Sequence, residues 1–251
     1  MVELARSFGR AAEEYELGRP GYAAAALDAV GLASSAVVLD LAAGTGKLTR
    51  QIVFRVARVL AVEPLAEMRA VLERVVPEAE ALAGSADAIP LEDDAVDAVL
   101  VGEAFHWFAT AATLAEIARV LRPDGTLAIL FNQVDGDFEP PLPEAFWDAY
   151  RAAAIEKPPE QTVRTGLWKA PFPGPFESFV ESSFPNPVEL GREQVLAQAA
   201  SWSMIGALPA RERSALLARL GELLPAGVYR HPLRTDLYRT RLREELPDRD
   251  G

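Results

Sequence analysis

The sequence predicts an α/β fold built on a doubly wound, mostly parallel sheet with helices on both faces. Five short apolar segments alternate with stretches of helical periodicity between residues 37 and 131, a pattern typical of successive strand and helix units. The first of these segments, 37–41, is aliphatic apart from one aspartate, as expected for a strand that is covered on both faces. A glycine-rich turn follows it, and in open α/β sheets ligands bind at that carboxyl edge.

Composition and charge argue against several classes of protein. The chain has 251 residues and a net charge of −12, which argues against nucleic acid and anionic membranes as partners, because both require clustered Lys and Arg. No apolar run approaches the ~20 residues needed to span a bilayer, and residues 1–10 lack a signal-peptide core, so we expect a cytoplasmic protein. Because the chain has no cysteine, two histidines and no acidic ligand loop, we expect no metal centre.

Apolar periodicity and Gly or Pro breakers predict the remaining elements. The strands expected before Asn132 are 37–41, 58–63, 80–83, 97–101 and 126–131. The helices expected around them are 22–30, 47–55, 65–75 and 113–121. Beyond Asn132 we expect a helix at 143–154, a strand at 176–184, helices at 192–201 and 210–224, and a final strand at 229–242.

The turn after the first strand contains two glycines, Gly44 and Gly46, that allow the backbone to approach a ligand closely. The second predicted strand ends in an acidic residue, Glu63, which follows Gly44 by 19 residues. A separation of about 20 is expected when an acid at this place accepts hydrogen bonds from the ribose hydroxyls of a bound nucleotide. The spacing therefore indicates a ligand that contains a nucleoside.

Two other nucleotide sites fit this turn less well. A P-loop requires G-x-x-x-x-G-K-[ST], but Leu41 and Leu48 stand where the first glycine and the hydroxyl residue belong. A dinucleotide site requires a third glycine, and Thr49 stands in its place. With Asp40 before the turn, a cationic or zwitterionic nucleoside is a better candidate than NAD, and an NAD-linked oxidoreductase is kept as a weaker alternative.

Six segments, in the same order along the chain, resemble motifs of the class I S-adenosylmethionine-dependent methyltransferases, in the small-molecule branch that includes trans-aconitate methyltransferase-like proteins. They are a Y-x-x-x-R-P-x-Y pattern at 15–22, the glycine motif at 39–46, Val62–Pro64 with Met68, the loop at 84–90, the aromatic segment at 104–108 and the turn at 121–126. The resemblance implies a Rossmann-like, seven-stranded sheet with a cap inserted in the C-terminal half. It also implies methyl transfer from S-adenosylmethionine.

The same resemblance implies roles for individual residues. The glycine turn would hold the methionine portion of the cofactor, Glu63 the ribose, and Met68 the adenine. The implied cofactor contacts are Tyr15, Arg19, Asp40, Ala42, Gly44, Gly46, Glu63, Pro64, Met68, Ser85, Ala86, Glu103 and Ala104. Many relatives have aspartate where Ser85 stands, so the contact to the adenine amine is expected to be weaker here, or to come from Asp87 or the backbone.

The acceptor site is predicted in the aromatic segment after the fourth strand. Phe105, Trp107 and Phe108 would form its wall, because aromatic faces stabilise a nearby cation. His106 is the candidate catalytic base for a hydroxyl acceptor. A carboxylate acceptor would need no base, and His106 or Arg19 would then only hold it.

Four segments are expected within a single methyltransferase domain, 1–251. N-terminal lid helices occupy 1–32, the cofactor-binding core 33–132 and the substrate cap 133–175, while 176–251 completes the sheet. The cap segment is rich in aromatic residues and proline, which suits a moderately apolar small-molecule acceptor. A protein that binds the nucleoside without catalysis is the second functional hypothesis.

Three cations in the second half of the chain would instead favour an acceptor that carries a carboxylate. They are Arg151, Arg164 and Lys169. The sequence alone does not choose between the two kinds of acceptor.

Overall fold

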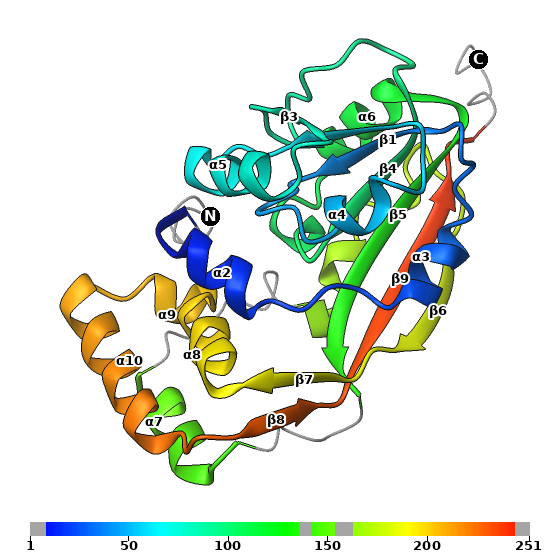
Figure 1. The fold of residues 1–251 in the computed structure, drawn as a ribbon. Helices are drawn as coiled ribbons and strands as arrows, with labels where there is room; N and C mark the ends of the chain where they lie inside the picture. Colours follow the sequence, from blue (N-terminus) through cyan, green and yellow to red (C-terminus); the bar gives the residue numbers. More distant parts are fainter. Residues whose placement is uncertain (1–8, 136–141, 154–162, 244–251) are drawn as a thin grey trace.

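A single sheet of seven strands organises this protein (Figure 1). The computed structural model describes residues 9–135, 142–153 and 163–243, so the parts of the predicted segments at 1–8, 136–141, 154–162 and 244–251 lie outside it. In spatial order the strands are β3 (Glu80–Leu82), β2 (Arg58–Val62), β1 (Val37–Leu41), β4 (Val96–Gly102), β5 (Leu121–Val134), β9 (Leu233–Arg241) and β6 (Val180–Pro185). β9 pairs antiparallel with β5 and with β6, and the other four pairs of strands are parallel, which confirms the predicted doubly wound, mostly parallel α/β fold.

The described helices match most of the predicted ones to within a few residues. They are α2 (Ala12–Gly18), α3 (Ala24–Val30), α4 (Thr49–Ile52), α5 (Ala66–Val75), α6 (Ala111–Val120), α7 (Glu144–Ala153), α8 (Arg192–Ala200), α9 (Ser203–Gly206) and α10 (Ala210–Leu223). The helix predicted at 47–55 is shorter than expected. No helix in the described part of the chain has the length and apolar character needed to cross a membrane.

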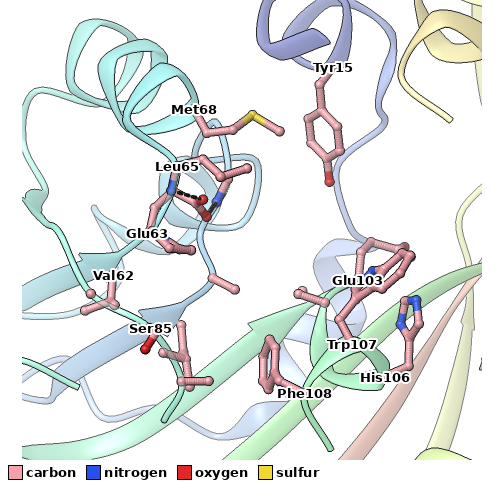
Figure 2. Close-up of a pocket in the computed structure, with 18 of the residues that line it drawn as sticks. Tyr15, Val62, Glu63, Leu65, Met68, Ser85, Glu103, His106, Trp107 and Phe108 are labelled. Carbon is pink, nitrogen blue, oxygen red and sulfur yellow. Dashed lines mark hydrogen bonds between the residues drawn. The ribbon is translucent and has the colours of Figure 1, made fainter. Parts of the chain in front are cut away.

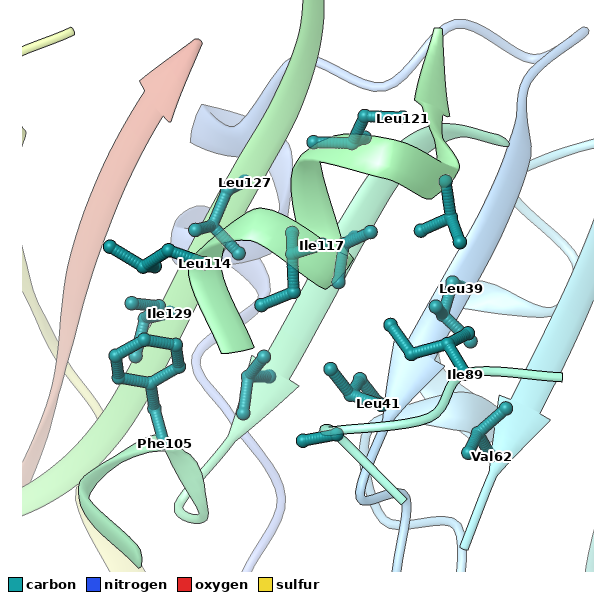
Figure 3. Close-up of a cluster of buried hydrophobic side chains, with 14 of the residues drawn as sticks. Leu39, Leu41, Val62, Ile89, Phe105, Leu114, Ile117, Leu121, Leu127 and Ile129 are labelled. Atoms are coloured by element: carbon teal, nitrogen blue, oxygen red, sulfur yellow. The ribbon is translucent and has the colours of Figure 1, made fainter. Parts of the chain in front are cut away.

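Strand β1 is buried on both faces, which explains its nearly continuous apolar sequence. Leu39 lies in the cluster that α6 covers, where it joins Ile117 (Figure 3). Val38 points to the opposite face and lies in the cluster with Leu27 of α3 and Ile52 of α4. The alternation of neighbouring side chains across the sheet therefore fixes β1 between two helical layers.

The order of the strands reverses beside β1, which pairs in parallel with β2 on one side and with β4 on the other. The connections that leave β1 and β4 consequently run to opposite faces of the sheet. This divergence opens a crevice at the carboxyl edge, where ligands bind in open α/β sheets.

The final predicted strand, 229–242, is two strands that belong to different sheets. β8 (Val228–His231) pairs with β7 (Val188–Gly191), whereas β9 joins the main sheet. Pro232 lies between β8 and β9, and proline cannot donate a hydrogen bond to a strand ladder. The strand predicted to start at residue 176 begins at Val180, with only an isolated bridge at Phe176.

The aromatic residues of the segment expected as a cap, 133–175, divide between two places. Trp168 packs in the core of the sheet with Phe131. Trp147 instead packs with α8 and α10 in a separate apolar cluster. This cluster defines a helical lobe, residues 142–153 and 188–231, which lies to one side of the sheet in Figure 1. The sequence predicted an acceptor-binding surface from the aromatic residues of this segment, whereas Trp147 and Trp168 are buried in apolar clusters.

Helix α2 contacts both the helical lobe and the core. Its last residue, Gly18, packs directly on the backbone of α8, and a Cβ built on it would lie 2.1 Å from the nitrogen of Gln198. On the other side, Ala12 of α2 packs with Met68 and Val71 of α5. The chain that precedes the sheet in sequence thus joins the two parts of the molecule.

Gly18→Ala should destabilise the protein by about 1–3 kcal/mol, because the added methyl group overlaps main-chain atoms that cannot rotate away. Urea unfolding would measure the loss. Gly221→Ala in α10 is the matched control, since its Cβ would meet no atom closer than 3.8 Å. The control should keep or raise stability, because alanine favours a helix over glycine by about 1 kcal/mol. Equal stability of the two variants would contradict the close packing of α2 on α8.

Candidate functional site

A cavity of about 530 Å³ lies at the carboxyl edge of the sheet (Figure 2). Its walls come from the segments that follow β1, β2, β3 and β4, from α2, and from Ser203 of the helical lobe. The predicted site residues that line it are Tyr15, Arg19, Ala42, Gly44, Glu63, Pro64, Met68, Ser85, Ala86, Glu103, Ala104, His106, Trp107 and Phe108. With Val163, residues from seven separate parts of the sequence are therefore brought to one cavity.

The predicted wall residue Phe105 does not line the cavity, which corrects its assignment to the acceptor site. Its side chain is fully buried, with ring centroids 5.9 Å from Trp168 and 5.6 Å from Phe172. The cause is the 3₁₀ turn η2 (Phe105–Trp107), which directs successive side chains to different sides. Trp107 and Phe108, by contrast, line the cavity.

Gly46 also lies outside the cavity lining and has a packing role. A Cβ at this position would lie 3.1 Å from Val76 and 3.2 Å from Leu72, and the backbone has a φ of +85°. Such a φ favours glycine. The second glycine of the motif thus allows the turn to pack closely on α5.

Glu63 is a buried carboxylate held by main-chain N–H groups. Its Oε2 accepts a hydrogen bond from the N–H of Gly44 and its Oε1 one from the N–H of Leu65, both at 2.9 Å. Burial raises the pKa of Glu63, and these two bonds oppose the shift. An ionised carboxylate offers about four lone-pair directions, so each oxygen can still accept a bond from a ligand in the cavity.

Asp40 lies beneath the glycine turn and does not line the cavity. Its Oδ2 accepts a hydrogen bond of 2.6 Å from the hydroxyl of Thr49, the residue that replaces the third glycine of a dinucleotide motif. Its Oδ1 is buried and has no hydrogen-bond partner among the described residues. Burial raises the pKa of Asp40 to about 7. One acceptor oxygen beneath the glycine turn is therefore left unsatisfied by the described residues.

Two residues at the cavity have a left-handed backbone without being glycine. Ala42 follows β1 with a φ of 59°, and Glu103 follows β4 with a φ of 62°. Such conformations are costly and persist where the surroundings impose them. Two hydrogen bonds hold Glu103 in this strained conformation. Its N–H donates to the carbonyl of Leu130 at 2.9 Å, and its Oε1 accepts from the N–H of Asn132 at 2.5 Å.

Helix α2 supplies the side of the cavity opposite Glu63 and Met68 (Figure 2). The guanidinium carbon of Arg19 lies 5.2 Å from the ring centroid of Tyr15. Burial raises the pKa of Tyr15 to about 12, so its phenol is protonated at neutral pH. Arg19 also donates from Nε to the hydroxyl of Ser201 at 2.8 Å, which ties this wall to the helical lobe.

His106 lies at the cavity with most of its surface buried. It is 9% exposed, and its ring centroid is 5.0 Å from that of Trp107 and 5.8 Å from that of Phe131. Aromatic rings thus pack beside His106, and the nitrogen atoms at the edge of its imidazole are the polar atoms that it adds to the cavity wall. An imidazole at a cavity wall can accept a proton near neutral pH.

The three cations considered for a carboxylated acceptor do not line the cavity. Arg151 pairs with Glu144 on the exposed side of α7, and Lys169 pairs with Glu181 at 2.6 Å. Arg164 is exposed.

Sequence reasoning missed Ser203 and Val163, which line the cavity. No local motif marks them, because they follow the core motifs by many residues.

Asp40→Asn should make the protein more stable than wild type at about pH 8. Because the pKa of Asp40 is raised from 3.8 to about 7, its burial as a carboxylate lowers stability as the pH rises between these values. Asparagine carries no charge and keeps an oxygen for Thr49. The advantage of the variant should therefore disappear as the pH falls to about 4, as measured by urea unfolding at each pH.

Asp97→Asn is the control with the opposite sign. Burial would raise the pKa of Asp97, but the N–H of Val37 and the guanidinium of Arg122 lower it below its usual value. This carboxylate stabilises the fold above its unfolded pKa, so Asp97→Asn should lose stability at neutral pH and approach wild type in acid. A pH-independent effect of Asp40→Asn would contradict the buried charge.

Comparison with known proteins assigns this chain to a family. A family profile described as a methyltransferase domain matches residues 39–129. An uncharacterized methyltransferase of Mycobacterium tuberculosis is 48% identical over 133 residues, and the match spans 53% of this chain and 55% of that relative. An uncharacterized methyltransferase of Schizosaccharomyces pombe is 32% identical over 228 residues, which cover 88% of both chains.

A solved structure described as a type II methyltransferase of Anaeromyxobacter dehalogenans has the same fold. It superposes with a TM-score of 0.61 and 23% identity, over 92% of this chain and 99% of the other. The relative of Schizosaccharomyces pombe, matched over 88% of both chains, shows the family, and the solved structure shows the same fold. This chain belongs to the class I S-adenosylmethionine-dependent methyltransferases.

Proposed function

We propose that this protein binds S-adenosylmethionine in the cavity at the sheet edge and directs its methyl group to a small-molecule acceptor, most directly to a hydroxyl or carboxylate oxygen. The observation that carries the proposal is the buried carboxylate of Glu63. Both of its oxygens are held by main-chain N–H groups, and the residue lines the cavity at the end of β2. A fixed carboxylate here is suited to a ribose diol.

The residues around Glu63 have the chemistry that the rest of the cofactor requires. Met68 offers an apolar surface for the adenine, beside the loop that contains Ser85. A Cβ on Gly44 would lie 3.9 Å from Cε1 of Tyr15, so the absence of a side chain leaves space between the turn and α2. The acidic Glu103 suits the amino group of the methionine portion, and the cation of Arg19 suits its carboxylate.

Asp87 lies in the loop expected to contact the adenine amine. Its Oδ1 accepts a bond of 3.0 Å from the hydroxyl of Thr113, and the residue lines the cavity. Its place on the cavity wall supports Asp87 as the replacement for the aspartate that many relatives have at the position of Ser85.

S-adenosylmethionine carries its methyl group on a positively charged sulfur that is a good leaving group for in-line displacement. The task of this chain is therefore to position the acceptor, align it and exclude water. Trp107 and Phe108 provide aromatic faces that stabilise a cation near them. His106 would take the proton of a hydroxyl acceptor, whereas a carboxylate would need no base.

The acceptor would enter between the aromatic segment after β4 and the helical lobe. Val163 and Ser203 line the cavity from the second half of the chain, and one is apolar while the other offers a hydroxyl. A cavity of about 530 Å³ supports a small molecule as acceptor. The net charge of −12 argues against a nucleic-acid acceptor.

Calorimetry with S-adenosylmethionine and S-adenosylhomocysteine tests the binding step, and transfer of a labelled methyl group to a metabolite panel tests the reaction. Binding of neither ligand would overturn the proposal. Binding of both with no transfer to any acceptor would favour the hypothesis of a binding protein without catalysis.

Glu63→Ala should weaken binding of S-adenosylhomocysteine by about 1.5–3 kcal/mol, because two bonds to a charged acceptor are lost. The same substitution releases Gly44, so a second ligand is needed to isolate the ribose contact. An analogue without the 2′- and 3′-hydroxyls should lose much less affinity from the substitution. Glu73→Gln, on the exposed face of α5, should bind both ligands as wild type does. An equal loss for both ligands would contradict the ribose contact.

His106→Ala should reduce turnover of a hydroxyl acceptor by about 10²–10⁴-fold while the affinity for S-adenosylhomocysteine changes little. Turnover of an acceptor from the metabolite panel and calorimetry would be measured on the same variant. Added imidazole should restore part of the activity. If affinity and turnover fall together, His106 shapes the cavity and is not a base.

A further inference from the structure

Lys47 follows the glycine motif, at a place where a P-loop would direct a lysine to phosphate. In this chain Lys47 does not line the cavity. Its Nζ donates a short hydrogen bond to the main-chain carbonyl of Glu16 in α2 and lies 3.5 Å from the Oε1 of that residue. Lys47 therefore binds α2, the helix that forms one wall of the cavity, and does not point into the cavity.

Arg50 of α4 binds the same carboxylate and also the glycine turn. One guanidinium nitrogen donates to Oε1 of Glu16 at 2.7 Å, and Nε donates to the carbonyl of Gly46 at 3.4 Å. Two cations from the segment after the glycines thus converge on one acid of α2. This arrangement connects the glycine turn to α2 without passing through the helical lobe.

The burial of this cluster distinguishes it from the other ion pair between α2 and the core. The side chains of Lys47 and Glu16 are 16% and 17% exposed. Arg74 and Glu13, by comparison, are 58% and 66% exposed. Exposed pairs contribute little because water screens them, whereas removing Glu16 from this poorly exposed cluster leaves two cations without the acid that they share. The Glu16 cluster should therefore control the position of α2, and the Glu13 pair should not.

The position of α2 sets the cavity wall. This helix has seven residues, and so short a helix depends on tertiary contacts for its place. Glu16 directly follows Tyr15, and Arg19 lies one turn further on. Both Tyr15 and Arg19 line the cavity, so the contact that holds Glu16 also holds the wall opposite Glu63.

We propose that Lys47 and Arg50 are positioning residues that latch α2 over the cavity through Glu16, and that this latch slows the release of an S-adenosyl ligand. The inference rests on the proposed binding of S-adenosylmethionine at this site. It assigns the lysine of the glycine motif to retention of the ligand through α2, without direct contact between lysine and ligand.

The dissociation rate of S-adenosylhomocysteine, followed by tryptophan fluorescence in stopped flow, tests the latch. Lys47→Met and Glu16→Gln should each raise this rate about tenfold, with a much smaller change in the association rate. Lys47→Arg keeps the charge and should stay within about threefold of wild type. Arg74→Met breaks the exposed pair of the same helix and should change the rate by less than about twofold.

Hydrogen exchange separates a latch from a general loss of stability. In Lys47→Met, amides of 9–22 should exchange faster than in wild type, while those of β1 and the urea midpoint stay unchanged. Unchanged dissociation rates in both Lys47→Met and Glu16→Gln would overturn the inference, and so would an equal effect of Arg74→Met.

Failure of the proposed function would be recognised separately. If wild type binds neither S-adenosylmethionine nor S-adenosylhomocysteine, the proposed function is wrong, and hydrogen exchange in the free protein still tests whether Lys47 holds α2. If Lys47→Met does not fold, Glu16→Gln gives the same comparison, because it removes the opposite charge with almost no change in shape. Exchange of 9–22 that matches wild type in Glu16→Gln would then reject the latch.

Discussion

A carboxylate buried at the end of a strand is costly unless its oxygens are hydrogen-bonded, and Glu63 meets this constraint with two main-chain donors. One donor is the N–H of Gly44, so the carboxylate can be held only if the turn after β1 brings that N–H toward the end of β2. The turn reaches this position through left-handed backbone at Ala42 and Gly44. A hydrogen bond thus joins the glycine motif directly to the acidic residue that follows it by 19 positions.

The site concentrates negative charge that the fold would otherwise avoid. Asp40 is buried with one oxygen unsatisfied, and Glu63 raises its pKa further by repulsion after the larger effect of burial. Glu103 adds a third carboxylate at the same edge of the sheet. This arrangement costs stability in the free protein, and a ligand with a cationic sulfur and an ammonium group would offset that cost. Stability and binding are expected to oppose one another at Asp40.

Helix α2 is the element through which the distant parts of the molecule meet. Gly18 packs on α8, and Arg19 donates to Ser201 at the end of that helix. Glu16 on the same short helix binds Lys47 and Arg50 beside the glycine turn. A displacement of the helical lobe would therefore move α2 and, with it, the wall of the cavity. The lobe supplies Ser203 to the cavity as well, so the lobe and α2 both contribute to the wall of one cavity.

By itself the sequence determined the parallel core, the edge of the sheet that carries the site and most of the residues that line the cavity. These features depend on patterns local in the chain, such as apolar strands and the spacing from Gly44 to Glu63. Only the tertiary structure decided that Phe105 packs inward while Trp107 lines the cavity. The 3₁₀ turn that contains both residues points their side chains in different directions. Contacts such as that of Arg19 with Ser201, 182 residues apart, have no local signature, since side chains so distant in sequence meet only after the chain has folded.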